Sequence, residues 1–214
     1  MAFGGAAAAQ FETRMSSPVF PGPYNIAVGD FNHDGKLDVA VAGNKMQVLL
    51  GNGDGTFKEP TLPAPSLVPN WVATADINHD GNLDLVVADF SRFFTGVSVF
   101  LGNGDGTFQN PVNYSTPNAA PYIEVGDFNG DHRPDIVVLD VLQVSVLLGN
   151  GDGTFQEPAI NTTPSYAPSA MGIGDFNSDG KLDVAVAEQF CGISQVEILL
   201  GNGTGHLPSG RLTP

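Results

Sequence analysis

Short loops rich in aspartate and asparagine recur four times along the chain, with the pattern D-x-N-x-D-G-x-x-D or a close variant. The first copy contains Asp30, Asn32, Asp34, Gly35 and Asp38. Carboxylate and amide oxygens are hard ligands, and Ca²⁺ takes about six to eight such oxygens from a flexible loop. Carboxylates held this close together would repel one another without a cation. The loops therefore predict up to four Ca²⁺ sites, one in each copy.

We expect side-chain ligands at the first, third, fifth and ninth positions of each loop, and a backbone carbonyl ligand at the seventh. The predicted metal ligands are Asp30, Asn32, Asp34, Lys36, Asp38, Asp76, Asn78, Asp80, Asn82, Asp84, Asp127, Asn129, Asp131, Arg133, Asp135, Asp175, Asn177, Asp179, Lys181 and Asp183. The third copy departs from the pattern, because His132 replaces the glycine and Pro134 stiffens the loop. An Asx-rich turn without metal is the alternative interpretation.

An EF-hand loop begins in a similar way, but it ends with glutamate at its twelfth position. All four copies here have valine at that position, inside an apolar run of strand-forming residues. The loops are therefore predicted to join two strands, not two helices.

The loop is one part of a larger repeat. Its first aspartates are Asp30, Asp76, Asp127 and Asp175, which are 46, 51 and 48 residues apart. A second motif, LLGNGDGTF at 49–57, recurs at 100–108 and 147–155 and in degraded form at 199–207. The apolar pattern predicts four strands per unit, the fourth starting at the phenylalanine of this second motif. A four-stranded unit repeating roughly every 40–50 residues is typical of β-propeller blades.

The predicted fold is therefore all-β, a propeller-type array of four four-stranded antiparallel blades, each with a Ca²⁺ loop between its first two strands. The expected boundaries are an N-terminal segment at 1–24, then blades at 25–70, 71–121, 122–169 and 170–214. Residues 11–23 resemble a fourth strand with its connection, and the last unit lacks a good one. Three hypotheses stay open: the N-terminal segment completes the last blade, open edges pair with another chain, or the chain is part of a longer protein.

The composition excludes several classes of function. The formal charge is −15, from 23 acidic against 8 basic residues, which argues against nucleic acid and anionic membrane surfaces. No apolar run approaches the length of a membrane span, so membrane insertion is not expected. The single cysteine, Cys191, permits no internal disulfide.

The segments GDFNHDGKLDVAVA at 29–42 and LLGNGDGTF at 49–57, with their later copies, resemble the FG-GAP/VCBS repeat family, related to the blades of the integrin α-subunit propeller. The resemblance covers about residues 25–207. It implies an extracellular, secreted or cell-surface β-propeller with Ca²⁺ in the loop between the first two strands of a blade. Family members serve in adhesion, in glycan binding, or as accessory domains of secreted enzymes. Most form closed seven-bladed rings, whereas this chain has four units.

The function predicted from these features is a non-catalytic binding or adhesion module for a glycan or protein ligand. Tyr24, Trp71 and Tyr122 lie at nearly equivalent positions before the first strand of a unit, and Glu124 is the one charge on the small-residue face of such a strand. These four are the predicted ligand-binding residues, with packing between blades as the alternative for the aromatic rings.

Two other classes of function remain as alternatives. A self-assembling structural or filament subunit would use open blade edges, or the phenylalanines of the long connections 89–96 and 188–195, to form a homo-oligomer. Those phenylalanines are Phe90, Phe93, Phe94 and Phe190. A part of a secreted polysaccharide-degrading enzyme is the third class, but no clustered set of catalytic residues is recognisable and an enzyme is not expected.

Overall fold

The computed structural model describes residues 15–64, 66–90, 95–116, 118, 122–140, 143–162, 168–190 and 193–207. These residues form fourteen β-strands and no helix, so none of them forms a helix that could cross a membrane. The strands make four separate antiparallel sheets, one for each sequence unit. The predicted all-β fold with four blades is therefore confirmed.

Each sheet follows the chain order from its first strand outward. Blade 1 contains β1 (Asn25–Gly29), β2 (Asp38–Ala42) and β3 (Gln47–Leu49). Blade 2 contains β4 (Pro69–Ala75), β5 (Asp84–Phe90), β6 (Thr95–Phe100) and β7 (Val112–Ser115). Blade 3 contains β8 (Tyr122–Gly126), β9 (Asp135–Leu139), β10 (Gln143–Leu147) and β11 (Ala159–Thr162). Blade 4 contains β12 (Pro168–Gly174), β13 (Asp183–Phe190) and β14 (Ile193–Leu199).

The fourth strand is the part of the blade where the prediction is wrong. Among the described residues, blades 1 and 4 have three strands, not four. In blade 1, only Thr61 bridges to Val48, because Pro60 and Pro63 on either side have no N–H to continue a ladder. Phe57, Phe108 and Phe155 do not start a fourth strand either; each forms an isolated bridge to a glycine of the preceding turn. Residues 208–214 lie outside the described residues.

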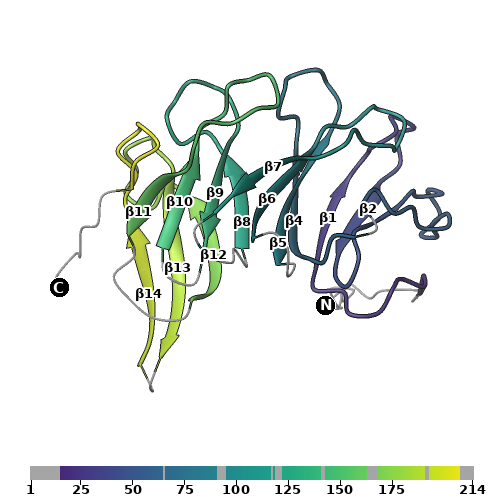
Figure 1. The fold of residues 1–214 in the computed structure, drawn as a ribbon, viewed down its shortest axis with the longest axis horizontal. Coiled ribbons are helices and arrows are strands. Elements are labelled where there is room, and N and C mark those ends of the chain that lie inside the picture. The colour runs from purple at the N-terminus through teal and green to yellow at the C-terminus, as the bar shows by residue number, and fades with distance from the viewer. Residues whose placement is uncertain are drawn as a thin grey trace, which may run out of the picture.

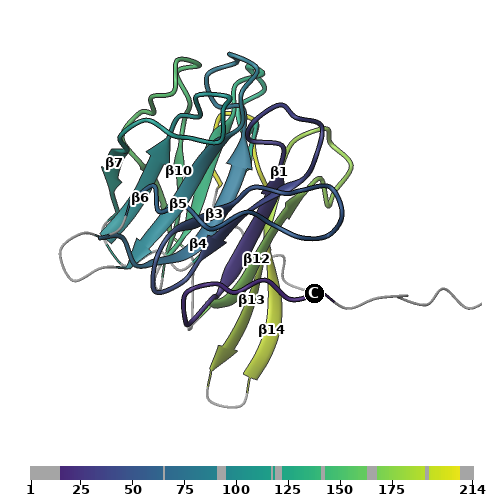
Figure 2. The same ribbon diagram turned by 90° about the vertical axis from the view of Figure 1, so that its right-hand side faces the viewer.

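The two long connections also differ from the prediction. Residues 89–90 and 95–96 pair as the ends of β5 and β6, and 188–190 pair with 193–195 as the ends of β13 and β14. These segments are therefore mostly extended hairpins, and Figures 1 and 2 show the β13–β14 hairpin projecting beyond the other sheets. Phe93 and Phe94 lie outside the described residues, as do the side chains of Phe90 and Phe190.

The hydrophobic cores lie between consecutive blades. One cluster joins blades 1 and 2, a second joins blades 2 and 3, and a third joins blades 3 and 4. The first strands β1, β4, β8 and β12 are successive neighbours. The second strands of the two inner blades, β5 and β9, are buried on both faces, which is typical of continuous apolar runs. Figure 1 shows the result, an open fan of sheets with blade 1 and blade 4 at its opposite ends.

The described part of the N-terminal segment lies against blade 1. The backbone N–H of Phe20 donates to Oε1 of Gln47 on β3 at 2.8 Å, and Lys45 Nζ lies 5.2 Å from the centre of the Phe20 ring. Tyr24 N then donates to Ala42 O at 2.8 Å, which leads the chain into β1. Residues 15–24 therefore extend the surface of blade 1.

Candidate functional site

Each aspartate-rich loop turns through two residues with left-handed backbone angles, at its fourth and sixth positions. In the first loop these are His33 (φ 56°) and Gly35 (φ 78°). The third loop exchanges the two residue types, with Gly130 (φ 77°) at the fourth position and His132 (φ 63°) at the sixth. The departure noted in the sequence thus falls at a position that favours glycine, and the glycine has moved to the other left-handed position of the same loop.

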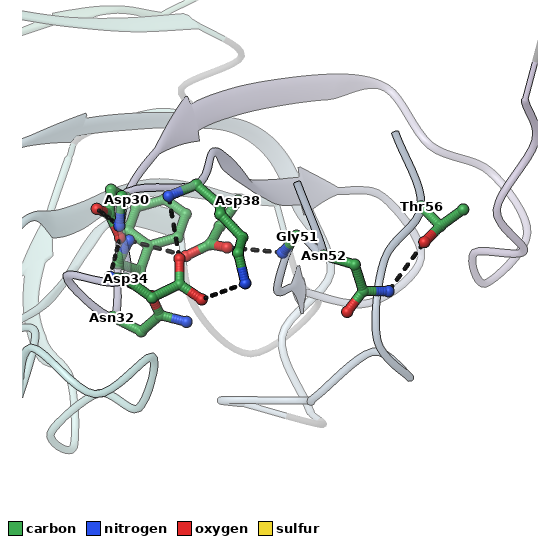
Figure 3. Close-up of polar contacts among 10 residues, drawn as sticks. Asp30, Asn32, Asp34, Asp38, Gly51, Asn52 and Thr56 are labelled. Atoms are coloured by element: carbon green, nitrogen blue, oxygen red, sulfur yellow. Dashed lines mark hydrogen bonds and ion pairs between the residues drawn. The ribbon is translucent and has the colours of Figure 1, made fainter. Parts of the chain in front are cut away.

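The outer part of the loop is held by its own backbone amides. The Asp30 carboxylate accepts the N–H of Asp34 at 3.2 Å and of Gly35 at 2.8 Å, while Asn32 Oδ1 accepts the Asp34 N–H at 3.0 Å. Asp34 Oδ1 in turn accepts the N–H of Lys36 at 3.0 Å. Figure 3 shows these oxygens gathered inside the turn. The side chains at positions one, three and five thus share one small, exposed space.

The other three loops repeat these bonds. Asp76 and Asp175 accept the amides at the fifth and sixth positions, as Asp30 does, and Asp127 additionally accepts the N–H of Gly130 at 2.7 Å. Backbone N–H donation from Gly180 holds the pKa of Asp175 below its ordinary value, and the N–H of Asn82 does the same for Asp80. These hydrogen bonds favour the ionised form of each carboxyl group, which is the form that binds cations.

The ninth residue of each loop has a different environment. Asp38 is fully buried; its Oδ2 accepts the N–H of Phe31 at 2.9 Å and its Oδ1 accepts the N–H of Gly51 at 2.7 Å. The carboxylate thus ties the loop to the second motif of the same blade (Figure 3). Asp84, Asp135 and Asp183 are fully buried as well and make the same two bonds in their blades.

Burial raises the pKa of Asp84 and Asp135, against the lowering effect of the two amide hydrogen bonds that each accepts. The sequence predicted the ninth aspartate as a metal ligand, and that role stays a prediction. The structural role was missed, although both partners recur in every copy at fixed positions.

The second motif forms a tight turn, which is typical of its Asn-Gly and Asp-Gly pairs. Asn52 N donates to Thr56 O at 2.9 Å, and Asp54 Oδ1 accepts both the N–H and the hydroxyl of Thr56, at 3.0 and 2.6 Å. Its first glycine is needed for close approach, since a Cβ on Gly51 would lie 2.2 Å from the carbonyl oxygen of Leu37. The motif therefore packs closely against the aspartate-rich loop of its own blade.

The chemistry of the donors fits a hard cation such as Ca²⁺, because every side-chain donor at the first, third, fifth and ninth positions is an oxygen. In two loops, a lysine of the loop lies near the carboxylate at the fifth position. Lys36 Nζ lies 3.4 Å from Asp34, and Lys181 Nζ lies 3.5 Å from Asp179. Within the described part of the chain, no three His, Cys, Asp or Glu side chains are grouped as a metal site. The calcium sites thus remain predictions supported by donor type and recurrence.

Neighbouring loops contact one another along one end of the array. His33 Nε2 lies 2.9 Å from Asn82 Oδ1, which links the first loop to the second. Gly106 N donates to Phe31 O at 2.9 Å, and Gly205 N donates to Phe128 O at 3.1 Å, so each of these turns rests on the loop of the preceding blade. The first loop is therefore joined to blade 2, and the third loop to blade 4, by contacts along this end of the array.

Two recesses flank the third loop. One, of about 330 Å³, lies toward blade 2 and includes Ala75, Arg133 and Pro134 in its wall. The other, of about 290 Å³, lies between the third and fourth loops, and its polar lining comes from Asp127, His132, Asp175 and Lys181. The second recess thus combines carboxylates with a cation in a small concave space.

The predicted ligand-binding residues do not form one site. Trp71 and Tyr122 pack edge to face, with ring centres 5.2 Å apart, and join the cores on either side of blade 3. This is the inter-blade packing given as the alternative. Tyr24 is 64% exposed at the free face of blade 1 and has no ring contact with the described residues. Glu124 is half-buried, forms no ion pair with the described residues, and has its pKa raised by burial.

The repeats of this chain match a known family of protein repeats. The profile of the FG-GAP-like repeat matches three overlapping segments, residues 30–87, 76–138 and 127–186. These segments begin at the first aspartate of the first three loops and end within the second strand of the following blade. No sequence among curated proteins matches the chain.

Several solved structures share the fold. The chain is similar to an Agrocybe aegerita lectin that recognises non-reducing terminal N-acetylglucosamine, with TM-score 0.59 and 21% identity over 85% of this chain and 50% of the lectin. It is also similar to the Photorhabdus luminescens Tc holotoxin pore, with TM-score 0.53 and 18% identity over 88% of this chain and 9% of that one. A V. cholerae biofilm matrix protein gives TM-score 0.50 and 18% identity, over 87% of this chain and 27% of that protein. The chain thus spans about half the length of the lectin and less of the other two.

Proposed function

We propose that this chain, which belongs to the family of FG-GAP-like repeat proteins, is a calcium-stabilised, non-catalytic module that binds a glycan or protein ligand outside the cell. The observation that carries the proposal is the fourfold recurrence of an exposed loop whose candidate side-chain ligands are all oxygen atoms. Twelve of the 23 acidic residues lie in these loops, where only Lys36, Arg133 and Lys181 supply positive side chains. Such a charge distribution favours cation binding over general solubility.

The residues at positions one, three and five of each loop would hold the ion with their side chains, and the seventh residue with its carbonyl. Bound Ca²⁺ would neutralise the carboxylates and fix the loop conformation. Because the turns of blades 2 and 4 rest on the loops of blades 1 and 3, a fixed loop also stabilises these contacts between blades. Ion binding would therefore increase the stability of the whole array.

The recess between the third and fourth loops is the proposed ligand site. Asp127 and Asp175 offer acceptors, and Lys181 offers a donor, within a volume of about 290 Å³. Sugar hydroxyl groups donate and accept hydrogen bonds, so this mixture suits a glycan. The lectin with the same fold supports this choice, because it binds N-acetylglucosamine.

Titration calorimetry and thermal unfolding test the calcium proposal. Sites of extracellular modules bind with a Kd of roughly 10⁻⁴–10⁻³ M, so protein stripped with EDTA should release or absorb heat and gain melting temperature in about 10 mM Ca²⁺. Asp80→Asn should lower the number of bound ions by one, because it removes a carboxylate from the second loop. Asp105→Asn is the matched control, since Asp105 is an exposed turn aspartate outside the loops. No heat and an unchanged melting temperature would disprove the calcium proposal.

A glycan array, probed in Ca²⁺ and in EDTA, tests the ligand. We expect binding that depends on Ca²⁺ and is lost in Lys181→Ala, whereas Lys58→Ala, an exposed lysine of blade 1, should bind normally. Binding that is equal in both variants would place the ligand elsewhere on the array.

A further inference from the structure

Each blade has one face toward the preceding blade and one toward the following blade, and specific residues pair across these contacts. Leu83 of blade 2 packs on Gly29 of blade 1, with its Cδ1 2.4 Å from where a Cβ on that glycine would lie. Leu182 of blade 4 packs on Gly126 of blade 3 in the same way, at 2.6 Å. A leucine on one face thus fits a glycine on the other.

At the contact between blades 2 and 3, neither the glycine nor the leucine of this pair is present. Ala75 replaces the glycine, and Pro134 replaces the leucine. The two residues line the recess of about 330 Å³ at this contact, where the larger leucine side chain is missing. The paired change shows that these two positions fit each other.

The two end faces present the unpaired halves of this same contact. On blade 1, Leu37 occupies the leucine position and is 67% exposed. On blade 4, Gly174 occupies the glycine position, and the nearest atoms to its Cβ position belong to Phe176 of its own blade, at 3.4 Å. The unpaired residues are therefore the leucine–glycine combination that packs twice inside the chain.

Other apolar residues of the two end faces are also exposed, although their equivalents inside the array are buried. The residues equivalent to Val196 of blade 4 are fully buried, whereas Val196 is 67% exposed. Those equivalents are Met46, Val97 and Val144.

On blade 1, Ile26 is 59% exposed, while the equivalent Val72 and Ile123 are 2% and 0% exposed. Phe176 is 52% exposed, although its equivalents Phe31, Ile77 and Phe128 are buried by the following blade.

At one further position of the blade 1 end face, a residue of the N-terminal segment takes the place of a residue from a preceding blade. Inside the array, Leu50, Leu101 and Leu148 each contact a turn glycine of the next blade, which is Gly106, Gly153 or Gly205. At the equivalent glycine of blade 1, Met15 Sδ lies 3.1 Å from where a Cβ on Gly55 would lie. The N-terminal segment thus places an apolar side chain where a preceding blade would supply a leucine.

We propose that a second copy of this chain docks head to tail, with the free face of its blade 4 on the free face of blade 1. Leu37 then packs on Gly174 of the second copy, and Leu200 of that copy displaces Met15. The surface is heterologous, so the two copies close into a ring or continue into a longer assembly. The inference is independent of the proposed calcium and ligand binding.

Analytical ultracentrifugation from about 1 µM to about 1 mM tests the docking, a range that covers weak to moderate self-association. Measurements in Ca²⁺ with about 0.15 M salt limit repulsion between the acidic copies. We expect the mass to rise above that of one chain. Ile26→Glu and Val196→Glu should each weaken the association at least about tenfold, because each places a charge in an apolar contact. Val112→Glu is the control, since Val112 is 46% exposed on the outer strand of blade 2.

Mixing the two end-face variants separates this contact from any symmetric one. Ile26→Glu retains an intact blade 4 face, and Val196→Glu retains an intact blade 1 face. Their mixture should therefore regain association up to two chains and stop there. A mixture that stays monomeric would overturn the head-to-tail arrangement.

Disulfide formation reports on the expected residue pair. In a Cys191→Ser background, Leu37→Cys with Gly174→Cys should crosslink into species of two or more chains, because the equivalent internal pairs are in contact. Crosslinking in Leu37→Cys combined with Val112→Cys is the control and should stay at background. A wild-type chain that remains monomeric up to about 1 mM would overturn the proposal outright.

Discussion

The two halves of each aspartate-rich loop use the same residue type for opposite purposes. Asp38, Asp84, Asp135 and Asp183 are fully buried, and each satisfies two backbone amides of its own blade. The aspartates at positions one and five are more exposed, and the partners described for them, backbone amides and a lysine ammonium group, belong to the loop itself. The inner carboxylate thus holds the blade together, and the outer ones are the proposed ligands of a cation. A motif that looks like a single ligand set is therefore also a structural joint.

The largest effect should come from removing an inner carboxylate. Asp84→Ala leaves the amides of Ile77 and Gly102 buried without an acceptor, and we expect a loss of about 3–5 kcal/mol in the free energy of unfolding. Asp80→Ala, in the outer half, should lose less than about 1 kcal/mol when both are measured by urea denaturation in EDTA. Equal losses would remove the distinction between the two halves.

Glycine substitutions should give an intermediate loss in the free energy of unfolding and show where the turn packs closely against the loop. A Cβ on Gly102 would lie 2.3 Å from the backbone carbonyl oxygen of Leu83, so Gly102→Ala forces the turn and loop apart, and we expect a loss of about 2–3 kcal/mol. Gly81→Ala meets no atom within 4 Å and suffers only from its φ of 89°, at a cost of about 1–2 kcal/mol. The same denaturation measurement ranks the two; a larger loss in Gly81→Ala would contradict the close approach.

The smallest effect concerns pH and the exposed turns. The hydroxyl of Thr107 donates to Asp105 and holds the pKa of that carboxyl below its ordinary 3.8. A lowered folded-state pKa contributes stability above the unfolded pKa and loses it as pH falls through the folded value. Asp105→Asn should therefore be less stable than wild type near neutral pH, and the difference should vanish as the pH falls through the lowered pKa.

NMR titration of the carboxyl carbon provides the direct check. Thr107→Val removes the hydroxyl donor, so the pKa of Asp105 should rise toward 3.8. The pKa of Asp54, which has its own threonine partner in blade 1, should stay unchanged in this variant and serves as the control. A constant pKa of Asp105 would show that the hydroxyl bond contributes little.

Local sequence patterns predicted the parts of the fold that depend on nearby residues. The repeat spacing located the four blades, and the apolar run after each loop predicted the second strands, β5 and β9 among them. The fourth strands were harder, because Pro60 and Pro63 interrupt a ladder that the phenylalanine pattern suggested. Propensity identified the chain segment but not its partner.

The candidate site was predictable in composition and less so in geometry. The oxygen-rich loop was evident from Asp30, Asn32 and Asp34, but the bond from Gly51 to Asp38 joins residues 13 apart and depends on strand pairing. Trp71 and Tyr122 were placed at equivalent positions by the sequence. Their mutual packing follows only from the stacking of adjacent first strands. Contacts between units are the information that a repeat pattern alone does not contain.

The location of the cores between blades, rather than inside them, has a consequence for how such chains change in evolution. Duplication of one unit adds one strand set and one shared core at once, so the gain in stability per added unit is nearly constant. Deletion of blade 2 alone would bring Gly29 against Pro134, whereas deletion of blades 2 and 3 together would bring Gly29 against Leu182 and restore a leucine–glycine contact. Chains of this design can therefore change length most readily where the newly joined blades carry matching residues.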